Sequence, residues 1–314
     1  MKILAIDSTS KNLSICISDG NDILSFVNDY RSLKHMQNII GNIDKAFMNL
    51  PFGIHDIDLF AVNLGPGDFT GSRIGISIVK TFSMLSGKDA FGFNALDVFA
   101  FSSLFKNIKK IKKRIDRGGR AIIIPLMDVR NHEIFFSVYE AVVLEREPTA
   151  VSIKDIFNEF LNQNVIFISA EEGRNILIKK LYDKNILINK NEFVERFFQL
   201  LVQLKRLKQY TCSMYRSLFA EKPYDNKTGK PAVKKLEAID CTLTGNAFFS
   251  YSSIFEELMA RLSDADNIKI IIEKNNRYTR AEHISRLAFF RALTGTGDKN
   301  IAPFYVRDFI PFGK

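Results

Sequence analysis

The order of hydrophobic and polar residues predicts that the chain begins with three β-strands. Residues 2–7 are apolar enough to form a buried strand, and residues 13–18 alternate like a strand with one polar face. A turn signal at residues 19–22 separates this strand from a third apolar stretch at residues 23–27. The pattern therefore favours an antiparallel arrangement at the N-terminus.

A helical period follows. Apolar residues recur every three or four positions over residues 33–50, which predicts a helix that Pro51 and Gly53 end. Residues 59–64 then predict a buried strand, and residues 72–85 predict a second helix.

The same order of elements recurs later in the chain. Residues 124–128 match residues 3–7, residues 134–139 read as a second strand, and residues 165–169 predict a later one. Two copies of this pattern predict an α/β protein with two ribonuclease-H-like lobes. This is the plan of the actin, Hsp70 and sugar-kinase (ASKHA) group.

We expect the N-terminal lobe to span residues 1–105 together with a C-terminal helix within about 280–314. The second lobe is expected over residues 106–279. The repeat breaks down between about residues 192 and 262, which predicts an inserted helical segment in that lobe.

Composition places the chain among ordinary globular proteins. Its 314 residues are 46% hydrophobic and 25% charged, which excludes disordered and collagen-like classes. The three cysteines are far apart, so neither a zinc site nor a disulfide framework is expected. The N-terminal apolar run is too short for a signal peptide and no run is long enough to span a membrane, so we expect a cytoplasmic protein with no membrane contact.

The net charge of +9 is concentrated in two segments. Residues 106–120 hold eight Lys or Arg against one Asp, and residues 195–235 hold ten against three acids. These segments favour contact with a polyanion such as a nucleic acid, and Lys109, Lys110, Lys112 and Lys113 are the candidate contact residues. The first segment contains a Gly-Gly pair, so we expect a mobile link between the lobes. The alternative to a polyanion contact is a solvated surface in a chain that is rich in lysine throughout.

Asp7-Ser8-Thr9-Ser10 lies at the turn after the first strand. A carboxylate and hydroxyl groups there are a candidate nucleotide or phosphate site. Alternatively, the hydroxyls only form the turn. The matching half of a nucleotide site would need glycines after the late strand of the second lobe, where residues 167–173 offer bulky and acidic residues instead.

The glycine-rich stretch at residues 64–75 is the most specific motif. It matches neither a Walker A loop nor a dinucleotide fingerprint. Its glycines could bind an anion at a helix N-terminus or let that helix pack closely, and we prefer packing, with Gly75 as the contact. The residues of this motif singled out for the site are Gly65, Gly67, Thr70 and Gly71.

The four histidines form no metal-binding spacing, which argues against a metalloprotease. A catalytic pair of His132 with Asp128 is a weaker alternative, because single histidines are usually structural. We therefore expect no metal and no catalytic residue.

The motifs Ile3-Leu-Ala-Ile-Asp-Ser-Thr-Ser10 and Gly65-Pro-Gly-Asp-Phe-Thr-Gly-Ser-Arg-Ile-Gly75 resemble the TsaB (YeaZ) family, which takes part in tRNA N6-threonylcarbamoyladenosine (t6A) biosynthesis. Further matches lie at residues 94–97, 127–133 and 302–307. Asp68 departs from the family, which usually has Ser there.

The resemblance implies a non-catalytic paralogue of the transferase TsaD. Where TsaD has two metal-binding histidines, this chain has Ala95 and Phe99, which cannot coordinate a metal. No cofactor is expected, although ATP or ADP at the interface of a complex stays open.

The resemblance also implies a heterodimer with TsaD that supports threonylcarbamoyl transfer to adenosine 37 of ANN-decoding tRNAs. The TsaE ATPase would join, tRNA would bind through the complex, and the chain alone would form a homodimer. The alternative function is an actin-like-fold ATP-dependent phosphotransferase that uses Asp7. The expected partner-interface residues are Leu33, Met36, Ile40, Phe47, Arg73, Gly75 and Ile76.

Overall fold

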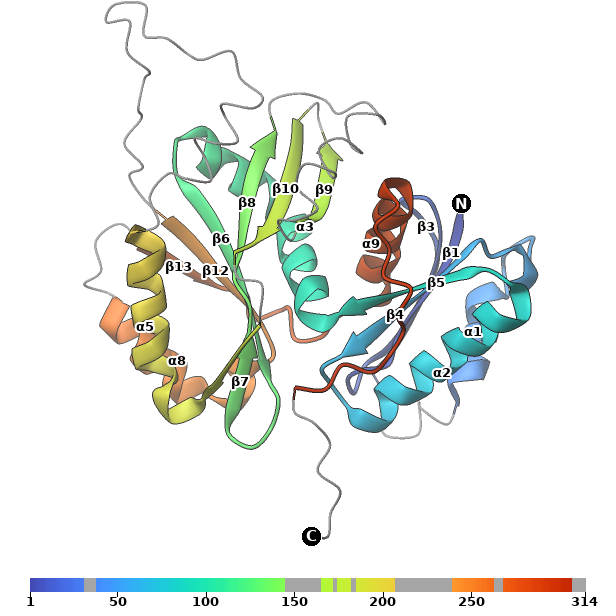
Figure 1. The fold of residues 1–314 in the computed structure, drawn as a ribbon, viewed down its shortest axis with the longest axis horizontal. Helices are drawn as coiled ribbons and strands as arrows, with labels where there is room; N and C mark the ends of the chain where they lie inside the picture. The colour runs from blue at the N-terminus through green and yellow to red at the C-terminus, as the bar shows by residue number, and fades with distance from the viewer. Residues whose placement is uncertain are drawn as a thin grey trace, which may run out of the picture. The chain divides into compact units, whose positions relative to one another are not determined.

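The computed structural model describes residues 1–30, 38–144, 165–171, 174–181, 185–206, 239–262 and 268–306. The chain divides into two compact units (Figure 1). Met1–Ser102 and Asn276–Lys314 form the first unit, and Ser103–Asn275 form the second. Each unit has its own β-sheet.

The sheet of the first unit has five strands in the order β3-β2-β1-β4-β5. β1 and β2 are antiparallel, whereas β4 runs parallel to β1 and β5 runs parallel to β4. The first three strands therefore confirm the predicted antiparallel arrangement. The strand bounds are β1 (Lys2–Asp7), β2 (Leu13–Asp19), β3 (Asp22–Asp29), β4 (Leu59–Gly65) and β5 (Asp89–Asn94).

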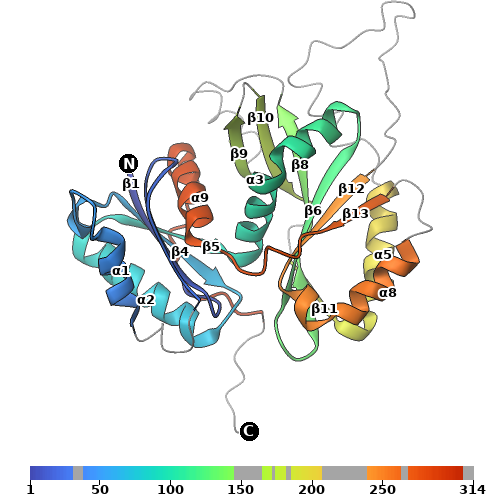
Figure 2. The ribbon, with the colours of Figure 1, turned by 180° about the vertical axis from the view of Figure 1, so that it is seen from behind.

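Helices cover both faces of this sheet (Figure 2). α1 (Ile39–Phe47) and α2 (Phe69–Ser86) pack on one face through a shared hydrophobic core, and a short 3-10 turn, η2 (Ile54–Asp56), follows α1. α9 (Ala281–Thr294) contacts β1, β2 and β4. The helix expected from residue 33 is described only from Ile39.

The polar face of β2 is buried rather than solvated. Ser14 Oγ accepts a hydrogen bond of 2.9 Å from the backbone N–H of Ala281, and the hydroxyls of Ser18 and Ser285 lie 2.6 Å apart. The alternation in β2 therefore reflects two buried faces, of which one binds α9 through hydroxyl groups.

α3 (Ala95–Asp116) follows β5 directly and runs from the first unit into the second. The expectation of a mobile link is wrong for residues 106–116. Their apolar positions, such as the buried Ile111, continue the helical period of Leu104, so the segment stays helical.

The sheet of the second unit is built around β6 (Arg120–Asp128). β7 and β8 pair antiparallel with β6, β12 pairs parallel with it, and β13 runs parallel to β12. In the first unit, β4 likewise runs parallel to β1, and β5 runs parallel to β4. The two units therefore share a strand arrangement, which confirms the predicted two-lobed α/β plan. The other strands are β7 (Glu133–Phe136), β8 (Tyr139–Leu144), β9 (Val165–Glu171), β10 (Arg174–Lys180), β11 (Ile186–Asn189), β12 (Ile239–Gly245) and β13 (Ile268–Ile272).

The bounds of the expected insertion, about 192–262, need correction. α5 (Lys190–Arg206) and α8 (Ser252–Leu262) share the hydrophobic core of the second unit with β12, and the short α7 (Ala247–Ser250) lies between β12 and α8. Since β12 is the parallel neighbour of β6, most described residues of this segment belong to the lobe itself.

The prediction that residues 165–169 form the strand equivalent to β4 in the second lobe is wrong. β9 pairs antiparallel with β10 and does not contact β6 in the sheet, whereas β12 takes the place that β4 has in the first unit. β12 ends in Gly245 with φ +115°, as β4 ends in Gly65 with φ +97°. The expectation that this glycine would lie at residues 167–173 refers to the wrong strand. The glycine at the end of the equivalent strand is Gly245. No helix in the described part of the chain is long and apolar enough to cross a membrane.

Candidate functional site

Asp7 ends β1, and its side chain is fully buried. Its Oδ1 atom accepts hydrogen bonds from the backbone N–H and the hydroxyl of Thr9, at 3.0 and 2.8 Å, and Oδ2 accepts one from Asn63 Nδ2 at 3.0 Å. Asn63 also donates to Thr279 Oγ1 at 2.9 Å and accepts from the Gly65 N–H at 2.9 Å. Asp7 therefore joins the ends of β1 and β4 within one unit.

The hydroxyl groups beside Asp7 are engaged as well. Ser8 Oγ donates to the carbonyl oxygen of Gly71 at 2.8 Å, and Ser10 Oγ donates to the carbonyl oxygen of Asn12 at 3.2 Å. Ser8 and Thr9 are buried, and Ser10 is half-buried. These contacts support the interpretation of this segment as a structural turn.

The N–H groups of Asp68, Gly71 and Ser72 at the start of α2 have protein acceptors. Asp68 caps the helix, because its Oδ1 atom accepts from the Gly71 N–H at 2.9 Å. Its own N–H donates to the carbonyl oxygen of Thr9 at 2.5 Å, and its carbonyl accepts from the Ser72 N–H at 3.0 Å. A carboxylate at this position also repels an anion, so this helix N-terminus is poorly suited to bind phosphate.

Two glycines of the motif are needed for close packing. A Cβ atom at Gly67 would lie 2.2 Å from the carbonyl oxygen of Thr9, and one at Gly75 would lie 2.2 Å from Ser8 Oγ. The motif therefore brings α2 against the turn after β1, which supports the packing interpretation.

The residues expected at the partner interface differ in exposure. Gly75 and Ile76 are buried inside the first unit, so a direct contact of these two with a partner is no longer expected. Arg73 and Thr70 are exposed. Leu33 and Met36 lie outside the described residues.

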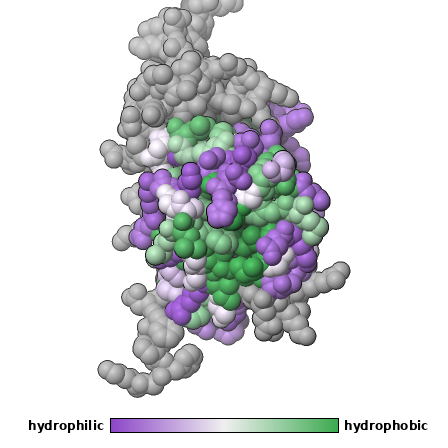
Figure 3. All heavy atoms as spheres, turned by 90° about the vertical axis from the view of Figure 1, so that its right-hand side faces the viewer, coloured by the Kyte–Doolittle hydropathy of each residue, from purple (hydrophilic) through white to green (hydrophobic). Residues whose placement is uncertain are grey.

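Large apolar side chains are exposed on α1 and α2. Ile40 and Met48 lie at the two ends of α1, and Met84 and Leu85 near the end of α2 are more than 80% exposed. Phe47 is half-buried against Phe52 in an edge-on ring contact. Figure 3 shows the side of the molecule that carries α1 and α2, where hydrophobic residues gather between hydrophilic ones.

An aromatic and arginine cluster lies at the start of α2. The guanidinium carbon of Arg73 is 3.8 Å from the centre of the Phe69 ring, and Arg73 Nε donates to the Tyr305 hydroxyl at 2.9 Å. The Phe69 and Tyr305 rings are 5.6 Å apart. The neighbouring Phe304 N–H donates to the carbonyl oxygen of Leu64 at 2.8 Å. The glycine-rich motif and the segment at residues 302–306 therefore meet here. Both motifs are visible in the sequence, but neither predicts that Phe69 and Tyr305 meet in one cluster.

The second unit has an equivalent of Asp7 at the end of β6. Asp128 Oδ1 accepts from the Tyr251 hydroxyl at 2.9 Å, and Oδ2 accepts from Ser250 Oγ at 2.5 Å. Burial and then the hydrogen bond to Asp128 raise the pKa of Tyr251 to about 12. His132 is exposed in the following turn. These contacts do not favour the catalytic pair of His132 with Asp128.

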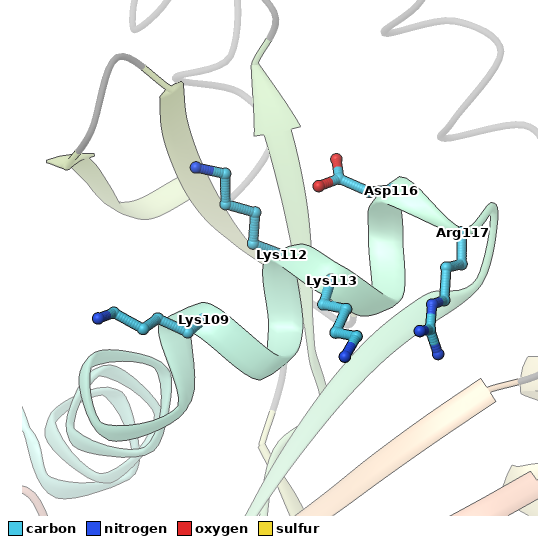
Figure 4. A pocket seen from close by; sticks show the side chains of 5 residues that line it. All are labelled: Lys109, Lys112, Lys113, Asp116 and Arg117. Atoms are coloured by element: carbon cyan, nitrogen blue, oxygen red, sulfur yellow. The ribbon is translucent and has the colours of Figure 1, made fainter.

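Charged side chains follow the second half of α3, where Lys109 and Lys112 point in a different direction from Lys113 and Arg117 (Figure 4). Lys109, Lys112 and Lys113 line a shallow depression together with Asp116 and Arg117, and Lys110 is exposed beside it. The spacing of three, four and eight residues keeps these cations on neighbouring turns of the helix. Among the described residues, no ion pair is found for these three lysines.

Two other cations of this segment have structural partners. Arg120 is buried and pairs with Glu140 at 2.6 Å, and it also donates to the carbonyl oxygen of Leu204. Arg114 pairs with Asp240 at 3.3 Å. The charge available to a ligand is thus smaller than the sequence count indicates.

Ala95 and Phe99, which the resemblance aligns with metal-binding histidines of TsaD, are apolar and buried. Ala95 and Phe99 lie in the first two turns of α3, and neither is more than 2% exposed. Within the described residues, no three His, Cys, Asp or Glu side chains gather as metal ligands.

Comparisons with known proteins agree with these motifs. A family model described as tRNA N6-adenosine threonylcarbamoyltransferase (TsaD) matches residues 29–183. The tRNA threonylcarbamoyladenosine biosynthesis protein TsaB of Buchnera aphidicola is 32% identical over 108 residues, which are 34% of this chain and 51% of that protein. TsaB of Escherichia coli is 27% identical over 144 residues, which are 45% of this chain and 55% of that protein.

A solved structure has the same fold. YeaZ from Pseudomonas aeruginosa aligns with a TM-score of 0.55 at 14% identity, over 97% of this chain and 99% of that one. The chain spans about half the length of the curated relatives it matches in sequence. Sequence matches and fold together confirm the resemblance of this chain to the TsaB (YeaZ) family.

Proposed function

We propose that this chain is a non-catalytic subunit in t6A biosynthesis that forms a heterodimer with a TsaD-like transferase. The observation that carries the proposal is the exposed apolar face of α1 and α2. Met84 and Leu85 are more exposed than large apolar residues usually are in a monomer, and a partner would cover them. The matches to TsaB proteins support the same role.

The absence of catalysis is inferred from the site. Ala95 and Phe99 offer no metal ligand, and the two carboxylate oxygens of Asp7 already accept hydrogen bonds from Thr9 and Asn63. The transfer reaction would then occur on the partner, with threonylcarbamoyl passing to adenosine 37 of ANN-decoding tRNAs. TsaE would bind the assembled complex, and the free chain would self-associate through the same face.

The alternative, an ATP-dependent phosphotransferase, has less support. It needs a carboxylate that can reach a hydrated cation, but the Asp7 side chain is fully buried and both oxygens accept hydrogen bonds. Gly245 does restore one glycine that such a fold would use. ATP turnover by the purified chain distinguishes the two functions.

Contact with tRNA is a further part of the proposal. Lys109, Lys112 and Lys113 line one depression on neighbouring turns of α3, where they could contact successive phosphates of a nucleic-acid backbone. No aromatic side chain is exposed among them, so they would not read bases by stacking.

The experiment that tests the pairing is sedimentation of the purified chain with and without its TsaD homologue. A heterodimer at micromolar concentrations supports the proposal. Independent sedimentation of the two chains at that concentration contradicts it.

A further inference from the structure

We propose that Arg73 is the charged anchor of the partner interface and binds an Asp or Glu carboxylate of the partner protein. The inference rests on the proposed function and adds the chemistry of the contact. It starts from a guanidinium that the protein itself holds in place without a described carboxylate beside it.

Two aromatic rings fix the position of Arg73. Phe69, one helical turn earlier in α2, lies under the guanidinium at 3.8 Å, and Tyr305 accepts a hydrogen bond from Nε at 2.9 Å. These contacts use one face and one edge of the group. The two terminal nitrogens have no acceptor among the described residues, and they form the edge that pairs with a carboxylate through two parallel hydrogen bonds.

No ion pair joins Arg73 to a carboxylate among the described residues, so an acidic partner for it would come from outside them. Phe69 and Tyr305 are each 39% exposed, and α2 contains no Asp or Glu between its first and last residues. Met84 lies three helical turns after Arg73 on nearly the same face of α2, so a partner that lies along this face from Met84 to Phe69 would also remove water from Arg73. A buried charge without a partner is costly, so a stable interface has to supply the opposite charge.

Rigid aromatic and arginine groups dominate the energy of protein interfaces. Because Arg73 is already ordered in the free chain, little side-chain entropy is lost when the carboxylate binds. The apolar residues of α1 and α2 then give contact area, whereas Arg73 gives the choice of partner.

The test is the affinity of full-length variants for the TsaD homologue, measured by calorimetry at two salt concentrations. We expect Arg73→Gln to weaken binding roughly tenfold or more. Arg73→Lys should weaken it nearly as much, because an ammonium cannot form the two parallel bonds. Tyr305→Phe removes only the hydroxyl that holds Nε and should weaken binding a few-fold. Arg196→Gln, which removes an exposed arginine of α5 in the second unit, is the matched control and should bind like the wild type.

The outcomes separate this inference from the proposed function. If the wild type binds the TsaD homologue and Arg73→Gln binds equally well, the anchor is wrong and the pairing stands. If the wild type does not bind at all, both fail. If Arg73→Gln abolishes self-association but leaves heterodimer affinity unchanged, Arg73 serves a second copy of this chain, which also overturns the inference. Circular dichroism and thermal unfolding check that each variant folds.

Discussion

Gly75 in α2 lies directly against Ser8 in the turn after β1, and a Cβ atom at Gly75 would approach Ser8 Oγ to 2.2 Å. The hydroxyl has little freedom to move, because it donates to the carbonyl oxygen of Gly71 at 2.8 Å. The glycine-rich motif therefore acts first as a packing device that seats α2 on the sheet.

The substitution Gly75→Ala should lower the free energy of unfolding by about 1–3 kcal/mol, as overpacking of a filled site does. Urea unfolding measures this loss. Gly53→Ala is the control, because no atom lies within 4 Å of a Cβ there. In the Ser8→Ala background the alanine at position 75 should cost less, since the clashing oxygen is gone. Equal costs in both backgrounds would contradict the proposed contact.

Asp7→Asn tests whether Asp7 is structural or catalytic. The amide would point an N–H donor at Asn63 or at Thr9, both of which are donors, so we expect a loss of about 1–3 kcal/mol of stability. The substitution should leave ATP turnover unchanged, because the wild type is expected to have none. ATP hydrolysis by the wild type that is abolished in a folded Asp7→Asn protein would establish the phosphotransferase alternative.

Cys16 and Cys241 should be unreactive in the native protein. Burial raises the pKa of each thiol from 9.0 to about 12, so the nucleophilic thiolate is almost absent at neutral pH. Mass spectrometry after alkylation should find these two cysteines unmodified until the protein is unfolded. Native labelling of either one at the rate of a free thiol would refute their burial.

The same thiols make stability depend on pH at the alkaline side. Above about pH 9 the unfolded chain loses protons from these groups while the folded chain keeps them, so the free energy of unfolding falls as pH rises toward 12. Below pH 8 the thiols are protonated in both states and contribute no slope. Urea unfolding at pH 8 and pH 10 should therefore show a smaller decrease in the Cys16→Ala/Cys241→Ala protein than in the wild type.

The lysine cluster of α3 should contribute to tRNA affinity without base preference. Replacement of Lys109, Lys112 and Lys113 by Gln keeps the helix and removes three charges, so it should weaken tRNA binding of the assembled complex similarly for all tRNAs. The slope of log affinity against log salt should flatten by about one unit for each lysine–phosphate ion pair that the substitutions remove.

Filter binding at several salt concentrations provides this measurement. The control removes the same charge from exposed lysines elsewhere, namely Lys88, Lys269 and Lys274. Salt curves that superimpose for the wild type and the α3 variant would show that this cluster is only solvated surface.

The sequence was sufficient for the local elements and for the two-lobed plan. β1, β2 and α2 lie where the apolar period placed them, because each buries a continuous face of its own. The place of β12 could not be predicted, since its parallel pairing with β6 joins strands more than 100 residues apart and leaves no local signal.

The candidate site was predicted only in part. Asp7 and the glycines were identified, but their engagement with Asn63 and Thr9 depends on the register of β1 beside β4. The cluster of Arg73 with Tyr305 was missed because the two residues are 232 positions apart. Such contacts arise from tertiary packing, which periodicity does not encode.

The most direct test of the central claim is the t6A content of tRNA after reaction with the TsaD homologue, threonylcarbamoyl-adenylate and TsaE, with and without this chain. Mass spectrometry of the nucleosides gives the yield. The account predicts strong modification only when both this chain and the transferase are present, and none with this chain alone. Equal modification by the transferase without this chain, or modification by this chain without the transferase, would contradict it.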